Sequence, residues 1–182
     1  RLYDPSMPLV PEWWRTPIIM GIDVARSNDS TVATAVWVDW DHPDGLGFFE
    51  HRVLNWLELH DTDWESQYFK IVDFVRNYEV MRVGIDAQGV GGAVAERLAL
   101  LLPDIEVLSI SSDAKAQNER WVYLTELIQR DQLVIPGHSK ARRTKRWKKF
   151  NQQMLDLERI NRGPYLLAEA PDERGAFDDY PD

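Results

Sequence analysis

Three apolar segments separated by polar turns open the folded part of the chain. Residues 18–25, 31–40 and 48–59 are short and rich in β-branched or aromatic side chains, a composition typical of strands. Asp44 and Gly45, between the second and third segments, mark a turn. Strands joined by short connections pair most simply with their neighbours, so we predict an antiparallel three-strand meander.

The pattern then changes to helical spacing. Apolar side chains recur every three or four residues between 61 and 79, as at Trp64, Tyr68 and Ile71, which predicts a helix there. The same criteria predict strands at 80–86, 105–110, 133–136 and 163–170 and helices at 89–102, 118–130 and 140–159. We therefore expect an α/β fold in which a mixed sheet combines the meander with parallel strands and carries helices on both faces. This is the outline of the ribonuclease H-like fold.

Two of the predicted strands end in an aspartate. Asp23 closes the segment IIMGID, and Asp86 closes VMRVGID. In the ribonuclease H-like outline these strands run side by side, about 4.8 Å apart, so their carboxylates would share one Mg²⁺ or Mn²⁺ ion. A third acidic cluster at 178–182 would add a carboxylate from a helix that begins at Asp178, and Asp29 lies near enough along the chain to assist.

Each of these acids also has a purely structural interpretation. Asp23 can cap a strand, and Asp29 can form an Asx turn within the sequence SNDS. The acids of 178–182 can be favoured by the dipole at a helix N-terminus, where Pro181 is tolerated, or can form a simple acidic tail. Only convergence of separate segments on one pocket would favour the metal site.

The glycine-rich turn after Asp86 has two interpretations. The sequence DAQGVGGAVAERL passes from a strand to a helix, so backbone amides at the turn would face an anion such as a phosphate. Alternatively, the glycines allow the helix to pack closely on the sheet. A dinucleotide site is disfavoured because Val94 occupies the position of the third glycine in G-x-G-x-x-G, and no G-x-x-x-x-G-K-[ST] motif is present.

Composition narrows the class of protein. The 182 residues, 44% of them apolar, fit one globular domain, and the absence of cysteine excludes disulfides and thiolate metal sites. We expect no membrane association, because the sequence has no run of eighteen apolar residues and no signal peptide. Residues 1–17, with four prolines, are predicted to be an extended linker from a preceding domain, and residues 18–182 the folded domain.

The charge is unevenly distributed. A formal net charge of -9 argues against coating of nucleic acid by bulk electrostatics. Residues 140–149 nevertheless carry seven Lys or Arg and no acid. On one long helix, this segment would present a stripe of cations to a phosphate backbone or merely form a solvated face; the stripe consists of Arg142, Arg143, Arg146 and Lys149. Lys115 and Arg120 form a second basic spot just after the predicted strand 105–110.

Four pieces of the sequence resemble the nuclease domain of tailed-bacteriophage terminase large subunits, the motor proteins of DNA packaging. They are MGIDVA with the following NDST, VGIDAQGVGGAVAERL, the stretch from Lys115 through LTELIQRDQLVIPG, and the final FDDYPD. Together they span nearly everything between residues 18 and 182. The resemblance implies an endonuclease with the ribonuclease H-like fold.

The resemblance also implies a chemistry and a set of partners. The enzyme would be a two-metal-ion endodeoxyribonuclease that cuts concatemeric double-stranded DNA during viral genome packaging, using two Mg²⁺ or Mn²⁺ ions. Asp23, Asp86 and Asp178 would be the catalytic metal ligands, with Asp179 or Asp29 at a second ion. The basic residues would hold the DNA backbone. Expected partners are the packaging ATPase of the same polypeptide, the small terminase subunit and the portal protein, at the procapsid portal in the host cytoplasm.

The chain departs from the family pattern at its end. Members often carry His where this chain has Phe177, and a full helix where it stops at Asp182, so which of Asp178, Asp179 and Asp182 points inward stays open. Two other functions remain in view: a ribonuclease H-like resolvase or integrase, and a non-catalytic domain that docks the motor on the portal. An actin-like ATPase is disfavoured because VARSND, after Asp23, is not a glycine-rich turn with Ser or Thr.

Overall fold

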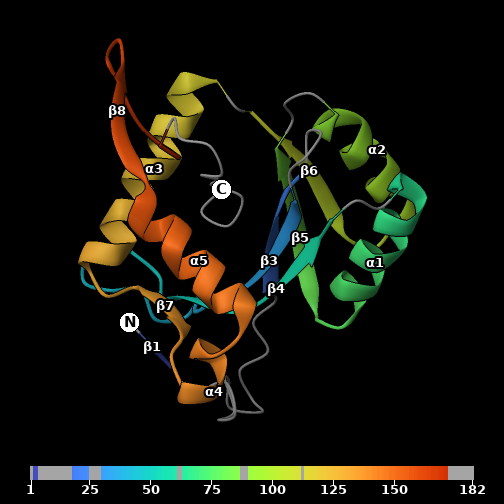
Figure 1. The fold of residues 1–182 in the computed structure, drawn as a ribbon, viewed down its shortest axis with the longest axis horizontal. Helices are drawn as coiled ribbons and strands as arrows, with labels where there is room; N and C mark the ends of the chain where they lie inside the picture. The colour runs from blue at the N-terminus through green and yellow to red at the C-terminus, as the bar shows by residue number, and fades with distance from the viewer. Residues whose placement is uncertain are drawn as a thin grey trace.

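A seven-stranded mixed sheet runs through the middle of the molecule (Figure 1). The computed structural model describes residues 2–3, 18–24, 30–60, 63–86, 90–111 and 113–171. In sheet order the strands are β1 (Leu2–Tyr3), β7 (Leu133–Pro136), β4 (His51–Leu59), β3 (Thr31–Val38), β2 (Ile18–Asp23), β5 (Val80–Asp86) and β6 (Glu106–Ile110).

The strand directions confirm the predicted topology. β2, β3 and β4 form an antiparallel meander, and β5 and β6 continue it as parallel strands on the β2 side. β7 joins the other side, parallel to β4. Of the predicted linker, only β1 lies within the described residues, where it pairs with β7.

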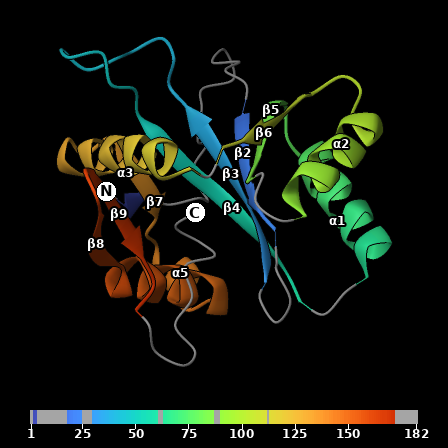
Figure 2. The ribbon, with the colours of Figure 1, turned by 90° about the horizontal axis from the view of Figure 1, so that it is seen from above.

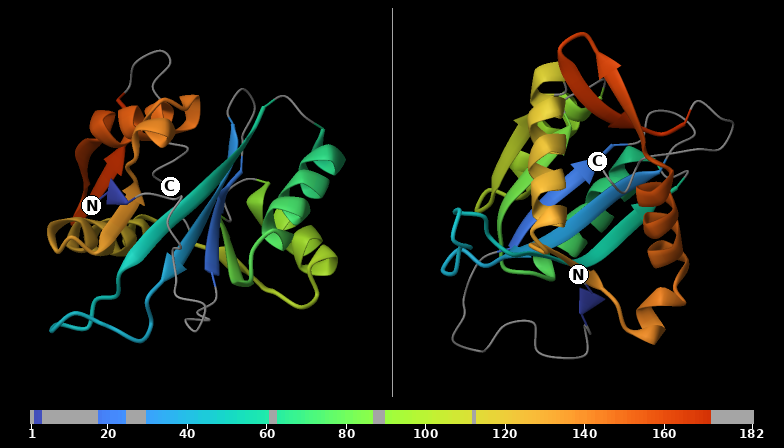
Figure 3. Two further views of the ribbon diagram at one scale, coloured as in Figure 1. Left: turned by 90° about the horizontal axis from the view of Figure 1, so that it is seen from below. Right: turned by 90° about the vertical axis from the view of Figure 1, so that its left-hand side faces the viewer.

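Helices cover both faces of the sheet, as expected. α1 (Trp64–Arg76) and α2 (Gly91–Leu101) lie on one side, and α3 (Ala114–Gln129), α4 (Ser139–Arg142) and α5 (Lys145–Asp156) lie on the other (Figure 2). A hairpin of β8 (Glu158–Arg162) and β9 (Tyr165–Glu169) packs along α3 (Figure 3). Within the described ranges, no helix has the length and apolar character needed to cross a membrane.

The face under α1 and α2, which we call the closed face, holds the main core. Asp63 caps α1 by accepting a hydrogen bond from the Ser66 N–H at 3.0 Å, and the helix then buries Ile71 and Val75 against the sheet. From α2, Leu98 is fully buried in the same cluster. Alternate residues of β2 and β5 supply the sheet side of this core.

The opposite face, which we call the open face, has a smaller core and a cavity. Trp56 and Phe150 pack with ring centroids 4.9 Å apart, joined by Val32 and Val53. Between the sheet, α3 and α5 lies a largely apolar cavity of about 330 Å³. This face is therefore only partly filled by its helices.

The prediction of one long helix at 140–159 is wrong. α4 ends at Arg142, Thr144 then caps α5 by accepting a hydrogen bond from the Trp147 N–H, and residues 158–162 form β8. The cap interrupts the helix because Thr144 has an extended backbone, with ψ at 148°. Gly163, at φ 62°, turns the chain from β8 into β9, so the strand predicted at 163–170 is one arm of a hairpin.

Candidate metal centre

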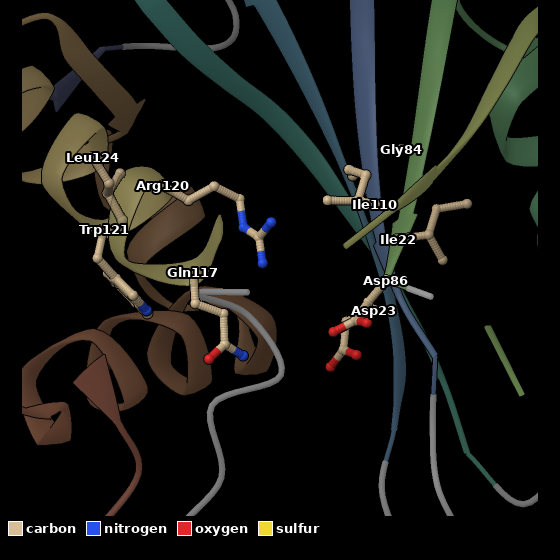
Figure 4. A pocket seen from close by; sticks show the side chains of 10 residues that line it. Ile22, Asp23, Gly84, Asp86, Ile110, Gln117, Arg120, Trp121 and Leu124 are labelled. Atoms are coloured by element: carbon tan, nitrogen blue, oxygen red, sulfur yellow. The ribbon is translucent and has the colours of Figure 1, made fainter. Parts of the chain in front are cut away.

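The pairing of β2 with β5 places Asp23 and Asp86 together. The two strands are parallel and in register at Ile22 and Ile85, so the aspartates that follow lie at the same end of neighbouring strands. Ile22 and Ile85 point into the closed face, and strand alternation sends both carboxylates to the open face. Figure 4 shows the two side chains next to each other in one pocket. The two carboxylates therefore line the same pocket, as the prediction of a shared cation requires.

The pocket around the two carboxylates has a volume of about 240 Å³ and two walls. One wall is the sheet, and the other is the first half of α3. From α3, Gln117 and Arg120 extend across the pocket toward the strand ends (Figure 4). The complete lining consists of Gly21, Ile22, Asp23, Gly84, Asp86, Ile110, Gln117, Arg120, Trp121 and Leu124.

Arg120 is held in place by the turn before α3. Its Nη1 donates a hydrogen bond to the Ser111 carbonyl at 2.7 Å. Asp113 caps the helix by accepting from the Ala116 N–H at 2.9 Å. This hydrogen bond, followed by one from the Ser111 hydroxyl, lowers the pKa of Asp113, so the cap stays ionised at neutral pH. One of the five guanidinium donors of Arg120 is thus used for anchoring, and the group faces the carboxylates across the pocket.

Gly91 fixes how closely α2 approaches Asp86. A Cβ at Gly91 would lie 1.6 Å from the carbonyl oxygen of Asp86, which no side chain could tolerate without movement of the backbone. The structural interpretation of this glycine is therefore correct. Gly92 has open space around its Cβ position among the described residues, and Gly89 lies outside them, so the anion-binding interpretation stays a prediction.

Of the acids predicted to bind metal, only two are within the described residues. Asp29, Asp178 and Asp179 lie outside them, as do Phe177 and Asp182. In the part that the structure describes, no group of three or more His, Cys, Asp or Glu side chains converges. Two carboxylates suit Mg²⁺ or Mn²⁺ by the chemistry of their oxygens but leave most coordination positions to further ligands or water. The donor set fits the cation as part of a site, and the metal-binding roles remain predictions.

The predicted basic stripe is divided between two helices. Lys149 forms an ion pair with Glu58 on β4 at 2.7 Å, and Arg146 donates to the Trp56 carbonyl at 2.9 Å, so both hold α5 against the sheet. Arg142, in α4, donates to the Gly137 carbonyl at 2.6 Å, and Arg143 is exposed between the two helices. The single-helix stripe was wrong, and contact of these four residues with DNA stays a prediction.

Other cations of the basic segment face solvent. Lys145 and Lys148 are exposed along α5, whereas Phe150 is buried. Lys115, on α3, is 69% exposed and lies 3.9 Å from Glu119. It does not belong to the lining of the pocket, in contrast to Arg120.

Sequence reasoning missed Gln117 and Trp121. Both lie on the face of α3 that carries Arg120, at spacings of three and four residues, with Leu124 one turn further. The helical spacing that suggests this face was available in the sequence, but the helix was predicted to begin at residue 118. The cap at Asp113 moves its start to Ala114 and brings Gln117 into the first turn.

The fold is shared with solved structures of phage nucleases, although no protein family model and no curated protein matches the chain. The large terminase nuclease of thermophilic phage G20c aligns with 16% identity over 91% of this chain and 77% of that one, with a TM-score of 0.66. Its magnesium-bound form aligns at 19% identity over the same shares, with a TM-score of 0.63.

A nuclease from a second phage gives a similar result. The manganese-bound large terminase nuclease domain of bacteriophage SPP1 aligns with 18% identity over 82% of this chain and 76% of that one, with a TM-score of 0.54. The chain therefore has the fold of the phage large terminase nuclease domains.

Proposed function

We propose that this chain is the nuclease domain of a phage large terminase and hydrolyses phosphodiester bonds of double-stranded DNA with the help of divalent cations. The observation that carries the proposal is the pair Asp23 and Asp86, which meet at adjacent strand ends in one pocket. Its support is the fold, which this chain shares with nucleases solved with Mg and with Mn.

The described residues have distinct tasks in this reaction. Asp23 and Asp86 hold the cations, with Asp178 and either Asp179 or Asp29 as the proposed further ligands. Cations bound there would activate a water molecule and neutralise the charge that develops on the phosphate oxygens, with two ions serving the attacking and leaving sides. Arg120 pairs with the phosphate from the opposite wall, and Gln117 donates a hydrogen bond to it from the same helix.

The wider setting of the reaction belongs to the same proposal. The substrate is concatemeric viral DNA at the procapsid portal. The partners are the packaging ATPase, the small terminase subunit and the portal protein. Binding to DNA is largely independent of sequence and weakens with salt, because contacts to the phosphate backbone carry it.

The test is metal-dependent nicking of plasmid DNA by Asp23→Asn and Asp86→Asn. We expect each variant to lose about a hundredfold or more of the cleavage rate with Mg²⁺ or Mn²⁺, because it lacks a direct metal ligand. The melting temperature should stay level or rise, because removing one of two adjacent negative charges relieves repulsion. Asp104→Asn, at an exposed acid in the turn before β6, is the matched control and should cut normally. Full activity in both site variants would refute the proposal.

A further inference from the structure

Gly21 lies in the interior of β2, on the face of the sheet that carries Asp23. Met20 and Ile22 are buried in the closed face, so Gly21 belongs to the open face together with Asp23, roughly 6–7 Å away along the strand. In the neighbouring strands it is paired with Gly84 and Thr34. Gly21 and Gly84 both line the pocket of the two carboxylates.

None of the described residues requires a glycine at position 21. Its backbone is not among the glycines with positive φ, and among the described residues nothing lies within 4 Å of the position where a Cβ would be. The residue is exposed, although it sits between two other strands of the sheet. Glycine in a strand interior weakens the strand, and one function of such a position is to let a ligand approach the backbone closely.

Two other glycines near the site, among the described residues, give a contrast. A Cβ at Gly84 would lie 2.3 Å from the Cδ1 of Ile110, and one at Gly91 would lie 1.6 Å from the Asp86 carbonyl oxygen. Packing against the Asp86 main chain therefore explains Gly91, and at Gly84 a Cβ would require the Ile110 side chain to move. Gly21 remains as a bare stretch of main chain in the lining of the pocket. The other wall of this pocket carries Gln117 and Arg120 (Figure 4).

We propose that Gly21 is a positioning residue: the sugar next to the scissile phosphate of the cleaved DNA strand lies directly on the main chain of β2 at this glycine. The inference rests on the proposed nuclease function. A phosphate held by cations at Asp23 and Asp86 would have its attached sugar within reach of Gly21, and Arg120 would hold the phosphate from the opposite wall. A side chain at position 21 would lift the DNA strand away from the carboxylates.

The test compares Gly21→Ala and Gly21→Val with wild type. Three quantities are measured: melting temperature, the Kd for a fluorescent duplex with Ca²⁺ in place of Mg²⁺, and the rate of plasmid nicking with Mg²⁺ or Mn²⁺. Gly45→Ala is the matched control, because a Cβ at Gly45 also meets open space among the described residues and its φ is not positive. We expect both Gly21 variants to melt at or above the wild-type temperature, since Ala and Val suit a strand better than Gly.

Activity should change in the opposite direction to stability. Gly21→Val should cut at least tenfold more slowly and bind the duplex more weakly, Gly21→Ala should fall between it and wild type, and Gly45→Ala should behave like wild type. Wild-type cutting and binding by Gly21→Val would overturn the inference and leave the nuclease function intact, as would a loss of activity accompanied by a lower melting temperature. A wild-type chain that never cuts DNA would instead overturn the nuclease function and this inference with it.

Discussion

The two faces of the sheet are built from the same strands but differ in how completely they are covered. Among the residues that the structure describes, the closed face buries fifteen side chains in one cluster under α1 and α2, whereas the corresponding cluster on the open face has four and adjoins a cavity of about 330 Å³. Alternate residues of β2 serve each face: Ile22 packs in the closed core, and Asp23 lines the pocket. The closed face thus fixes the strands, and the open face is left to carry the carboxylates.

Matched leucine substitutions give the largest expected effects. Leu98 is 0% exposed in the closed core, and Leu127 is 3% exposed but lines the open-face cavity. We expect Leu98→Ala to lower the free energy of unfolding by about 4–5 kcal/mol and Leu127→Ala by about 2–3 kcal/mol, because a side chain beside a cavity has fewer contacts to lose. Urea denaturation followed by tryptophan fluorescence measures both. Equal losses would show that the two faces contribute alike.

The contact between α2 and β5 links the closed face to the site. Gly91→Ala forces the helix away from the Asp86 carbonyl. We therefore expect this variant both to lose about 1–3 kcal/mol of stability and to nick plasmid more slowly. Gly92→Ala, one position on, adds a methyl in open space within the helix and should gain about 0.5–1 kcal/mol with nicking unchanged. If Gly91→Ala melts and cuts like wild type, close packing at this glycine does not position Asp86.

Substitutions of two adjacent lysines of α5 distinguish a packing role from contact with DNA. Lys149 is 30% exposed and paired with Glu58, so Lys149→Ala should cost up to about 1 kcal/mol of stability. Lys148 is exposed, and Lys148→Ala should leave stability unchanged while reducing the dependence of DNA affinity on salt by about 0.9 in the log–log slope. Chemical denaturation measures the stability of both variants, and binding titrations at several salt concentrations measure their affinity for DNA. The reverse result, a smaller salt dependence for Lys149→Ala and not for Lys148→Ala, would support the predicted contact of Lys149 with DNA.

The elements that the sequence predicts well are those whose pattern is local. The meander, β5, α2 and β6 follow from apolar runs bounded by turns, and the aspartates at 23 and 86 could be placed together once the strand order was assumed. The break between α4 and α5 was missed because the side chain of one residue, Thr144, overrides a helical pattern on both sides.

The site was predicted less completely, because its second wall depends on tertiary placement. Nothing in the spacing of α3 shows that Gln117 would lie opposite the ends of β2 and β5. The sequence around Lys149 and Arg146 indicates surface cations. Their partners, Glu58 and the Trp56 carbonyl, could not be inferred because they lie about ninety positions earlier in the sequence. The role of Gly21 emerges only by contrast with Gly84 and Gly91, whose close neighbours come from other elements.

The smallest predicted effect is a dependence of stability on pH that originates on the open face. His51 lines the cavity there, its Nδ1–H donates to the Phe49 carbonyl at 2.8 Å, and its ring meets the edge of Tyr123. Burial lowers the pKa of His51 below its ordinary value of 6.5, and the hydrogen bond to Phe49 opposes this only in part. Burial also raises the pKa of Tyr123, so that neighbour stays neutral throughout the range concerned.

The direction of this pH dependence follows from the number of protons that each state binds. As the pH falls below 6.5, the unfolded chain takes up a proton at His51 that the folded chain does not, so the folded state loses stability until the pH reaches the lowered pKa. Well above pH 6.5 the residue is neutral in both states and no longer contributes to the slope. We expect the urea midpoint of His51→Gln to change less than that of wild type between about pH 7.5 and about pH 5. A histidine titrates within this interval. If wild type and His51→Gln lose equal stability over this interval, the acid sensitivity belongs to other groups, and the open face does not contribute it through this histidine.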